Sequence, residues 1–440
     1  MSLPRDIKRQ YLLALDLNHA IKQGNRARAE ALLAAGAPVN GSNLMEYAPL
    51  TFIAVCGGVE LARLFVERGS DLDAGVNQDI LDSSGRLSVK RGTCALTMAI
   101  RNCHVDVFEL LVEAGANLNA ADCTGFTPLM SASMGVEEAE KGVVMAKALL
   151  LAGADPWQTN DEGCIALTYA AAEGSADVVD MLLERAPNTV SHVTSAGSTP
   201  LYGAACTGNV AAAVRLLAAG AVQPSLYQPS YCPLLQAVLD DNTGLVRVLA
   251  RHAKAVGGDA AVQTAIEVSM VKRRARILQM LLLSGGEKRQ ELWANCRLSD
   301  GSIILHDAAS SGTLGMLSAL LSAGADETRL DGNGRTALEA VRTSPCKDYF
   351  VTEEEAAAMR RMLLRGAAFR ARSWAWRAGV TGATALRGGC GGAGGAGGGS
   401  DGDPYGAGRS RRKAPPAVRI YRPENKVFFV RHVGRYSLKE

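Results

Sequence analysis

The stretch SAGSTPLYGAACTGNVAAAVRLLAAGA, residues Ser195–Ala221, decides the fold. The Thr199 hydroxyl can accept a hydrogen bond from an unpaired amide of a first helical turn, and Pro200 loses no hydrogen bond at the first helical position. A helix is therefore expected to start at residue 200. Gly208 and Gly220 are expected to end this helix and the next, because a glycine just past a helix enters the left-handed conformation without a Cβ clash.

The same pattern recurs along the chain at a fixed spacing. A constant period near 33 residues is typical of a solenoid built from one repeated supersecondary unit. Leucines at the position of Leu201 are 33 residues apart in four pairs: Leu17 and Leu50, Leu96 and Leu129, Leu201 and Leu234, and Leu305 and Leu338. Helix-ending glycines are expected at Gly36, Gly69, Gly115, Gly153, Gly220, Gly285, Gly324 and Gly366. Such an array makes binding the default function.

The repeated motif resembles the ankyrin repeat. That family's pattern is a Gly, Thr-Pro-Leu-His, paired Ala, Gly, paired Leu and Gly-Ala-Asp. This sequence matches it at Gly125, Thr127, Pro128 and Leu129, at Gly153, Ala154 and Asp155, and at Asp300, Gly301, Leu305, His306, Ala308, Ala309 and Gly312. The resemblance spans roughly residues 11–368. It implies an all-α solenoid of about ten helix–turn–helix repeats with β-hairpin loops.

The resemblance and the composition together predict the domain organisation. The ankyrin domain is expected over residues 1–368, followed by a basic C-terminal cap helix over 369–387. A Gly-rich flexible linker over 388–408 and a basic tail over 409–440 complete the chain, and the tail holds an expected β-hairpin around Pro423. The repeats are expected near residues 14–46, 47–92, 93–125, 126–163, 164–197, 198–230, 231–257, 258–301, 302–334 and 335–368.

Departures from the period predict insertions. The step from Leu50 to Leu96 is 46 residues, which predicts an extended hairpin within Ala74–Gly92. Further insertions are expected near Glu137–Lys141 and between Pro345 and Glu355, as surface loops. The least regular copy, Val262–Gly285, carries a basic run that is either a solvated loop or a contact for an acidic partner: Lys272, Arg273, Arg274 and Arg276.

Catalytic and metal-binding motifs are missing from the sequence. There is no Gly-Lys-Ser/Thr phosphate loop and no His-Glu-x-x-His. Gly392, Gly394 and Gly397 match a dinucleotide-binding spacing, but no apolar strand precedes them, so a flexible linker is the better interpretation. The ten cysteines show no Cys-x-x-Cys pair and are interpreted as reduced thiols. We therefore expect no enzymatic activity, no catalytic residues, no cofactor and no metal.

The net charge of +3 combines two opposite parts of the chain. Residues 359–440 hold 17 Lys and Arg against 4 Asp and Glu, whereas residues 1–358 hold 30 against 40. The basic tail has three alternative interpretations. It is a disordered extension, or it docks on an acidic partner or on the acidic repeats, or it serves in nucleic-acid binding or nuclear import. The last interpretation centres on Arg409, Arg411, Arg412 and Lys413. No membrane span or secretory signal is recognisable, so the protein is expected in the cytoplasm or the nucleus.

The family geometry implies where a partner would bind. In ankyrin arrays the hairpin tips and the exposed side of each first helix line a concave groove. Phe126 is the best anchor candidate, unless it simply covers its own hairpin. The implied contact positions are Cys123, Thr124, Phe126, Asp161, Glu162, Glu173, Ser195, Ser198, Thr207, Ser299, Asp300, Ser311, Asn333 and Arg335. Several are acidic or small and polar, which favours a ligand that is basic or rich in hydrogen-bond donors.

The sequence thus predicts a non-catalytic scaffold or adaptor that binds another protein through its concave face. A substrate receptor of a ubiquitin ligase is one version, although the usual ligase-binding boxes are not recognisable in the tail. The alternative is a nucleic-acid-associated regulator that uses the basic tail. Salt-dependent binding of the tail to nucleic acid separates the two.

Overall fold

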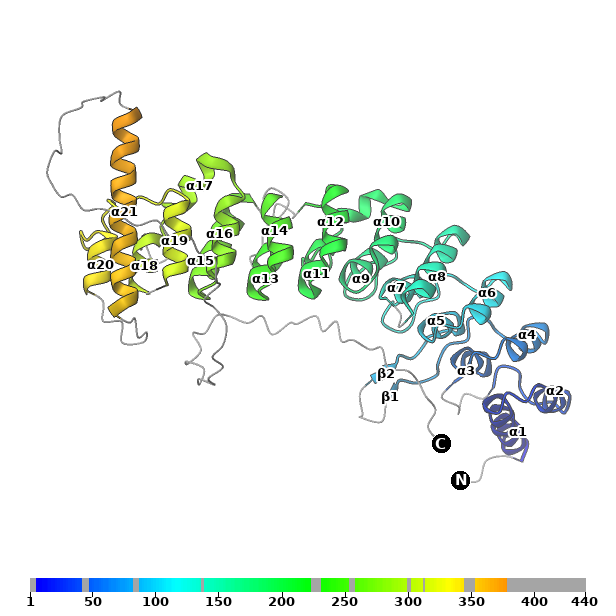
Figure 1. The fold of residues 1–440 in the computed structure, drawn as a ribbon. Helices are drawn as coiled ribbons and strands as arrows, with labels where there is room; N and C mark the ends of the chain where they lie inside the picture. The colour runs from blue at the N-terminus through cyan, green and yellow to red at the C-terminus, as the bar shows by residue number, and fades with distance from the viewer. Residues whose placement is uncertain are drawn as a thin grey trace, which may run out of the picture.

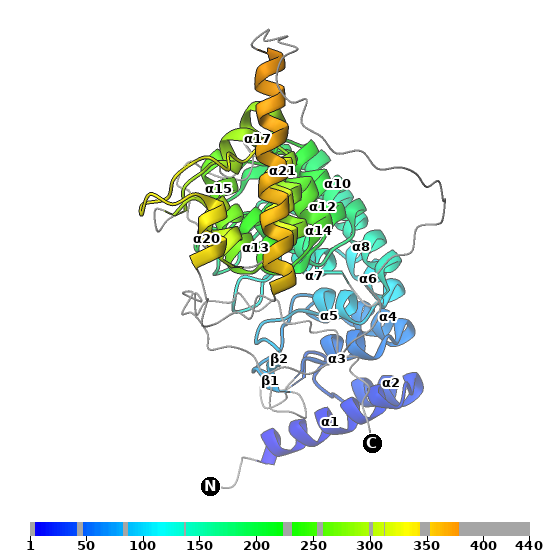
Figure 2. The same cartoon turned by 60° about the vertical axis from the view of Figure 1, so that its left-hand side comes forward.

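The fold is a curved stack of antiparallel helix pairs, seen in a computed structural model (Figure 1). The structure describes residues 5–41, 47–81, 87–135, 138–222, 231–252, 258–298, 302–311, 313–343 and 353–377. Turned by 60°, the same pairs follow an arc from α1 at one end to α21 at the other (Figure 2). Each pair packs only on its neighbours, as in a solenoid.

Each pair consists of a first helix and a second helix. The first helices are α1 (Arg5–Lys22), α3 (Pro49–Cys56), α5 (Ala95–Arg101), α7 (Pro128–Ser133), α9 (Ala166–Ala172), α11 (Pro200–Thr207), α13 (Pro233–Leu239), α15 (Gly258–Val271), α18 (Ile304–Ser310) and α20 (Ala337–Thr343). The second helices are α2 (Arg26–Ala34), α4 (Val59–Glu67), α6 (Val105–Glu113), α8 (Ala139–Ala152), α10 (Ala176–Arg185), α12 (Val210–Ala218), α14 (Thr243–Arg251), α16 (Ala275–Leu283), α19 (Leu314–Ser322) and α21 (Glu353–Arg377). The 3-10 helix η1 (Pro187–Ser191) and the helix α17 (Gly286–Ala294) interrupt this alternation.

The caps of α11 confirm the start and the end that the sequence predicts. The helix begins at Pro200, and the Thr199 hydroxyl accepts from the amide of Tyr202 at 3.3 Å. Gly208 ends the helix in the left-handed conformation with φ of 76°. We call the leucines at the position of Leu201 in each repeat the leucine ladder. These leucines form the core that joins the repeats, because all of them from Leu17 to Leu305 are buried. Leu338 is half-buried at the C-terminal end of the ladder.

Thr199→Ala should lower the free energy of unfolding by about 1 kcal/mol, because the Tyr202 amide loses its acceptor. Thr199→Ser keeps the hydroxyl and is the matched control. Denaturant titration of both variants measures the difference. Wild-type stability in the alanine variant would show that the cap contributes nothing.

Two of the eight expected helix-ending glycines are wrong. The other six adopt a positive φ, but Gly285 lies at −95° and forms the N-cap of α17, while Gly366 lies inside α21. A Cβ at Gly285 would meet the ring of Trp293, so this glycine makes room for a buried side chain. Its role is set by packing against the following helix and not by the end of the preceding one.

The insertions take different forms. The first one forms a hairpin, as expected, from the antiparallel strands β1 (Ile80–Leu81) and β2 (Leu87–Val89). The second insertion, expected near Glu137–Lys141, is not a surface loop in its described part, because residues 139–141 lengthen the start of α8, which has 14 residues where α6 has 9. The expected insertion after Pro345 lies mostly outside the described residues.

Polar side chains join consecutive repeats at the turn between the first and second helices. Asn209 donates to the carbonyl of Gly174 at 3.1 Å, and Asn242 donates to that of Gly208 at 3.5 Å. In the basic run, Arg274 reaches the carbonyl of Val238, and Arg273 donates to that of Ser311 at 2.7 Å. These two arginines therefore link neighbouring repeats within the chain.

The C-terminal helix α21 begins at Glu353, earlier than the cap helix expected over 369–387, and overlaps it in residues 369–377. The expected linker and tail, including Arg409 to Lys413, lie outside the described residues. None of the described helices is both long and apolar enough to cross a membrane.

Candidate protein-interaction surface

Three hairpin turns follow one another along the array, at residues 122–126, 160–164 and 194–198. Each is closed by a backbone hydrogen bond, from Asp122 to Phe126 at 3.1 Å in the first turn and from Asn160 to Cys164 at 3.0 Å in the second. The Asp122 carboxylate also accepts from the amides of Thr124 and Phe126, at 2.8 and 3.0 Å. Each turn is therefore rigid before any contact with its neighbour is made.

Backbone hydrogen bonds tie the three turns to one another, and we call them together the hairpin row. Cys123 donates to the carbonyl of Arg91 at 2.9 Å, Asp161 donates to that of Thr124 at 2.9 Å, and Ser195 donates to that of Glu162 at 3.0 Å. The turns approach closely at their glycines. A Cβ at Gly125 would lie 2.8 Å from Asn160 Cα.

The hairpin row brings together most of the N-terminal contact positions that the sequence predicts. Cys123, Asp161, Glu162 and Ser195 are exposed on it, and Thr124 is half-buried with its hydroxyl bonded to Asp122. Ser198 is only 9% exposed, so its side chain does not contribute to the surface.

Phe126 is half-buried between its own turn and the next repeat. Its ring meets the ring of Tyr169 edge to face, with centroids 5.1 Å apart. The Tyr169 hydroxyl accepts from the Asn160 side chain at 2.8 Å, and burial raises the pKa of Tyr169, which stays protonated. Phe126 thus joins two repeats and exposes only part of its ring.

Glu173 and Thr207 lie at the C-terminal ends of α9 and α11, away from the hairpin row by the length of a helix, about 10 Å. The Thr207 hydroxyl donates to the carbonyl of Ala172 at 2.5 Å, which links it to the preceding repeat. Glu173 caps α9 and is half-buried. These two positions form a second edge of the array and do not join the hairpin row.

The C-terminal contact positions form a separate group. Ser299 and Asp300 lie outside the described residues, and Ser311 caps α18. Asn333 is exposed on a turn of its own, where the Arg335 guanidinium binds the Asp331 carboxylate at 3.0 Å. Hydrogen bonds from the Arg335 amide and neighbouring groups hold the pKa of Asp331 below its usual value. No hydrogen bond among the described residues ties this turn to the hairpin row.

Two exposed apolar side chains beside the hairpin row were missed by the sequence reasoning. Val193 directly precedes the third turn. The Trp157 ring meets the His192 ring edge to face, with the two ring centroids 6.4 Å apart. His192 in turn binds the carbonyl of Gly163 in the second turn at 2.7 Å. An aromatic residue directly after Gly-Ala-Asp-Pro was the signal that could have identified Trp157.

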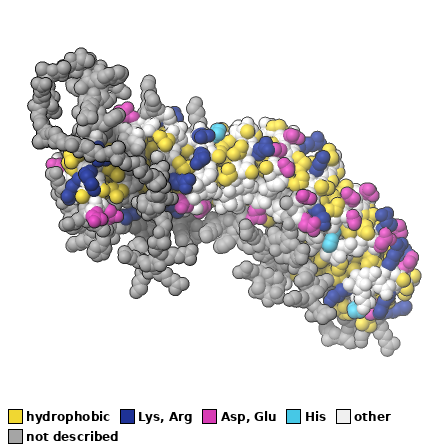
Figure 3. Space-filling model, in the orientation of Figure 1, with side chains coloured by type: hydrophobic (Ala, Val, Ile, Leu, Met, Phe, Trp, Pro, Cys, Tyr) yellow, Lys and Arg dark blue, Asp and Glu magenta, His cyan; other side chains and the backbone are white. Residues whose placement is uncertain are grey.

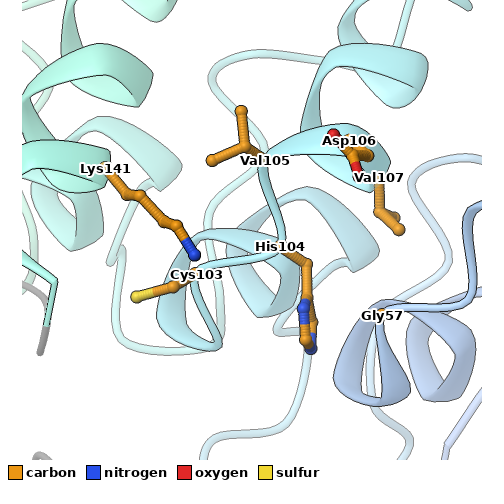
Figure 4. A pocket seen from close by; sticks show the side chains of 7 residues that line it. All are labelled: Gly57, Cys103, His104, Val105, Asp106, Val107 and Lys141. Atoms are coloured by element: carbon orange, nitrogen blue, oxygen red, sulfur yellow. The ribbon is translucent and has the colours of Figure 1, made fainter.

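A polar hollow of about 200 Å³ lies at the turn between α5 and α6 (Figure 4). The Lys141 side chain extends toward Cys103. The His104 ring shares a hydrogen bond with the Val55 carbonyl at 3.0 Å, and Lys141 pairs with Glu138 at 2.8 Å. The ring and the ammonium are thus engaged in structural contacts. In the described part of the chain no cluster of three or more His, Cys, Asp or Glu has the geometry of a metal site.

Comparisons with known proteins agree with this geometry. A family model described as ankyrin repeats, in three copies, matches residues 74–144 and 136–226. Ankyrin repeat protein nuc-2 of Neurospora crassa is 28% identical over 41% of this chain and 16% of its own length. E3 ubiquitin-protein ligase KEG of Arabidopsis thaliana is 25% identical over 64% of this chain and 17% of its own length. Ankyrin repeat and SOCS box protein 16 of Mus musculus is 31% identical over 48% of this chain and 44% of its own length.

The chain spans less than half the length of each of these relatives. The repeated helix pairs, the hairpin row and the family match define the class. This chain is an ankyrin repeat protein. Proteins built from these repeats generally bind other proteins. The nucleic-acid-binding role of the basic tail stays a prediction.

Proposed function

We propose that this protein is an adaptor or scaffold that binds a partner protein at the hairpin row. The observation that carries the proposal is the continuous chain of backbone hydrogen bonds from Arg91 to Ser195. It holds several exposed side chains in fixed relative positions, and a preorganised surface binds without a further cost of ordering. The family model matches these same residues.

The chemistry of the hairpin row favours a partner that presents a basic side chain next to an apolar one. Asp161 and Glu162 are adjacent and exposed, and neither carboxylate forms an ion pair with another described residue. Val193 lies just before Thr194 in the adjacent turn. A cation from the partner would therefore meet unpaired carboxylates beside an apolar contact.

The outer face of the array offers a contrast. Basic and acidic side chains are interspersed over the N-terminal second helices (Figure 3). Arg26 pairs with Glu60, and Arg68 pairs with Glu30 at 3.1 Å, so neighbouring helices neutralise one another there. Charges of one sign are therefore less concentrated on this face than at Asp161 and Glu162, which makes it suitable for a control substitution.

The double variant Asp161→Lys, Glu162→Lys should lose the partner that wild-type protein captures, with at least about tenfold weaker affinity. Glu109→Lys, Glu113→Lys makes the same charge change on the exposed side of α6 and is the matched control. Full-length wild type and both variants serve as bait in quantitative affinity capture, and calorimetry on the purified partner measures Kd. Equal loss in both variants, or loss in neither, would refute binding at the hairpin row.

A further inference from the structure

The helix α17 is an insertion between a second helix and the following hairpin. From Leu281 to Ile303 the chain uses 22 residues, whereas the equivalent step from Leu111 to Thr127 uses 16. Figure 1 shows α17 at the end of α16. Trp293 anchors it, because this side chain is only 3% exposed and its ring fills the space left by Gly285.

The inserted helix creates a groove of about 490 Å³ with α15 and the loop after α19. This volume lies in the range of about 300–1,000 Å³ that is typical of ligand sites. Asn295 fixes the far wall, since its side chain donates to the Gly324 carbonyl at 3.1 Å and accepts from the Asp326 amide at 2.7 Å. The groove is lined mainly by Asp259, Gln263, Glu291, Leu292, Trp293 and Cys296.

Most charged side chains of the groove are already paired or hydrogen-bonded within the protein, and Glu291 is the exception. Asp259 pairs with Arg289 at 3.6 Å, and Arg329 donates to the Asn295 carbonyl at 3.0 Å. Glu291 is exposed and forms no ion pair with any other described residue. A cation placed beside Glu291 would therefore be attracted.

Apart from Gln263, whose side chain donates to the Arg297 carbonyl at 3.4 Å, the remaining surface of the groove is apolar. Leu292 is 66% exposed at its rim, next to the buried ring of Trp293. Burial and the nearby Glu267 raise the pKa of the Cys296 thiol to about 11, so it lines the groove as a neutral group. The groove fits an apolar segment that carries cations at its ends.

We propose that the occupant is this chain's own segment Lys426–Arg431, with the sequence KVFFVR. Within residues 378–440 it is the segment in which two phenylalanines stand between two cations. The 48 residues between Arg377 and Lys426 can span up to about 160 Å at 3.3 Å each, more than the docking needs. The two aromatic rings cover the exposed side chain of Leu292, and a flanking cation pairs with Glu291. This docking does not rest on the proposed function, because the hairpin row lies in other repeats.

Photo-cross-linking in the full-length protein tests the position of the segment. A benzoyl-phenylalanine replaces Leu292, whose side chain is exposed, and the products are mapped by mass spectrometry. The expected product joins position 292 to residues 421–435 of the same chain. Cross-links to other parts of the chain, to a second copy of the chain, or to nothing would each overturn the proposal.

Hydrogen exchange in full-length variants tests the energetics independently. Leu292→Glu should make residues 421–435 exchange about tenfold faster, whereas Leu151→Glu, the same change at an exposed leucine of α8, should leave them unchanged. Phe428→Ser, Phe429→Ser removes the proposed contact without touching the repeats and should speed exchange in residues 286–296. Unchanged exchange in both the groove variant and the tail variant would overturn the proposal.

Discussion

Leu201→Asp should split the thermal unfolding of this array into two transitions. Leu201 lies on α11 and is only 2% exposed, between α9 and α13. The substitution removes the apolar contacts of a buried leucine and places a carboxylate in a dry site, at a combined cost of about 5 kcal/mol. Repeats contact only their neighbours, so a failed repeat in the middle uncouples α1–α10 from α13–α21.

Calorimetry and far-ultraviolet circular dichroism of the full-length protein measure this result. Val214→Asp introduces the same charge at an exposed position of α12, in the same repeat, and should keep the wild-type profile. A single transition at the wild-type midpoint in the Leu201 variant would mean that this residue does not couple the two parts of the array.

Gly125→Ala should destabilise the protein by about 2–4 kcal/mol, more than the same change at Gly334. Both glycines occupy a turn with nearly the same left-handed conformation, φ of 78° and 72°. A Cβ at Gly125 would lie 2.8 Å from Asn160 Cα, whereas a Cβ at Gly334 meets nothing within 4 Å. Gly334→Ala therefore carries the conformational strain alone, about 1 kcal/mol, and Gly125→Ala adds the clash with the next hairpin.

Two measurements separate these effects. Denaturant titration gives the difference in the free energy of unfolding between the two variants. Hydrogen exchange at the Asp161 amide reports the bond to the Thr124 carbonyl, which the clash should weaken in the Gly125 variant alone. Equal destabilisation by both substitutions would show that the hairpins are not packed as described.

Local features of the sequence predicted the helices well because their causes are local. Thr199, Pro200 and Gly208 set the ends of α11 through bonds made within a few residues. The same reasoning failed at Gly285, because its conformation depends on Trp293, the anchor of a helix that the repeat period does not contain. Period and capping chemistry therefore predict the regular repeats and not the inserted elements.

The candidate surfaces likewise have some features that the sequence predicted and others that it could not predict. The family pattern predicted which turns would carry contact positions, and the hairpin row contains several of them. It could not predict that Ser198 is buried. It also could not predict that Phe126 packs on Tyr169, because that contact is with a residue of the next repeat. The groove beside α17 depends on α15 and on a loop beyond α19, so no short stretch of sequence encodes it.

The bonds from Cys123 to Arg91, from Asp161 to Thr124 and from Ser195 to Glu162, which join neighbouring turns of the hairpin row, run between amides and carbonyls of the main chain. Side chains at these tips therefore contribute little to the geometry that displays them. Residues 123, 161 and 195 can be replaced by almost any amino acid while the scaffold beneath stays the same. Substitutions at the turn tips can therefore change the binding specificity of the array without changing its fold.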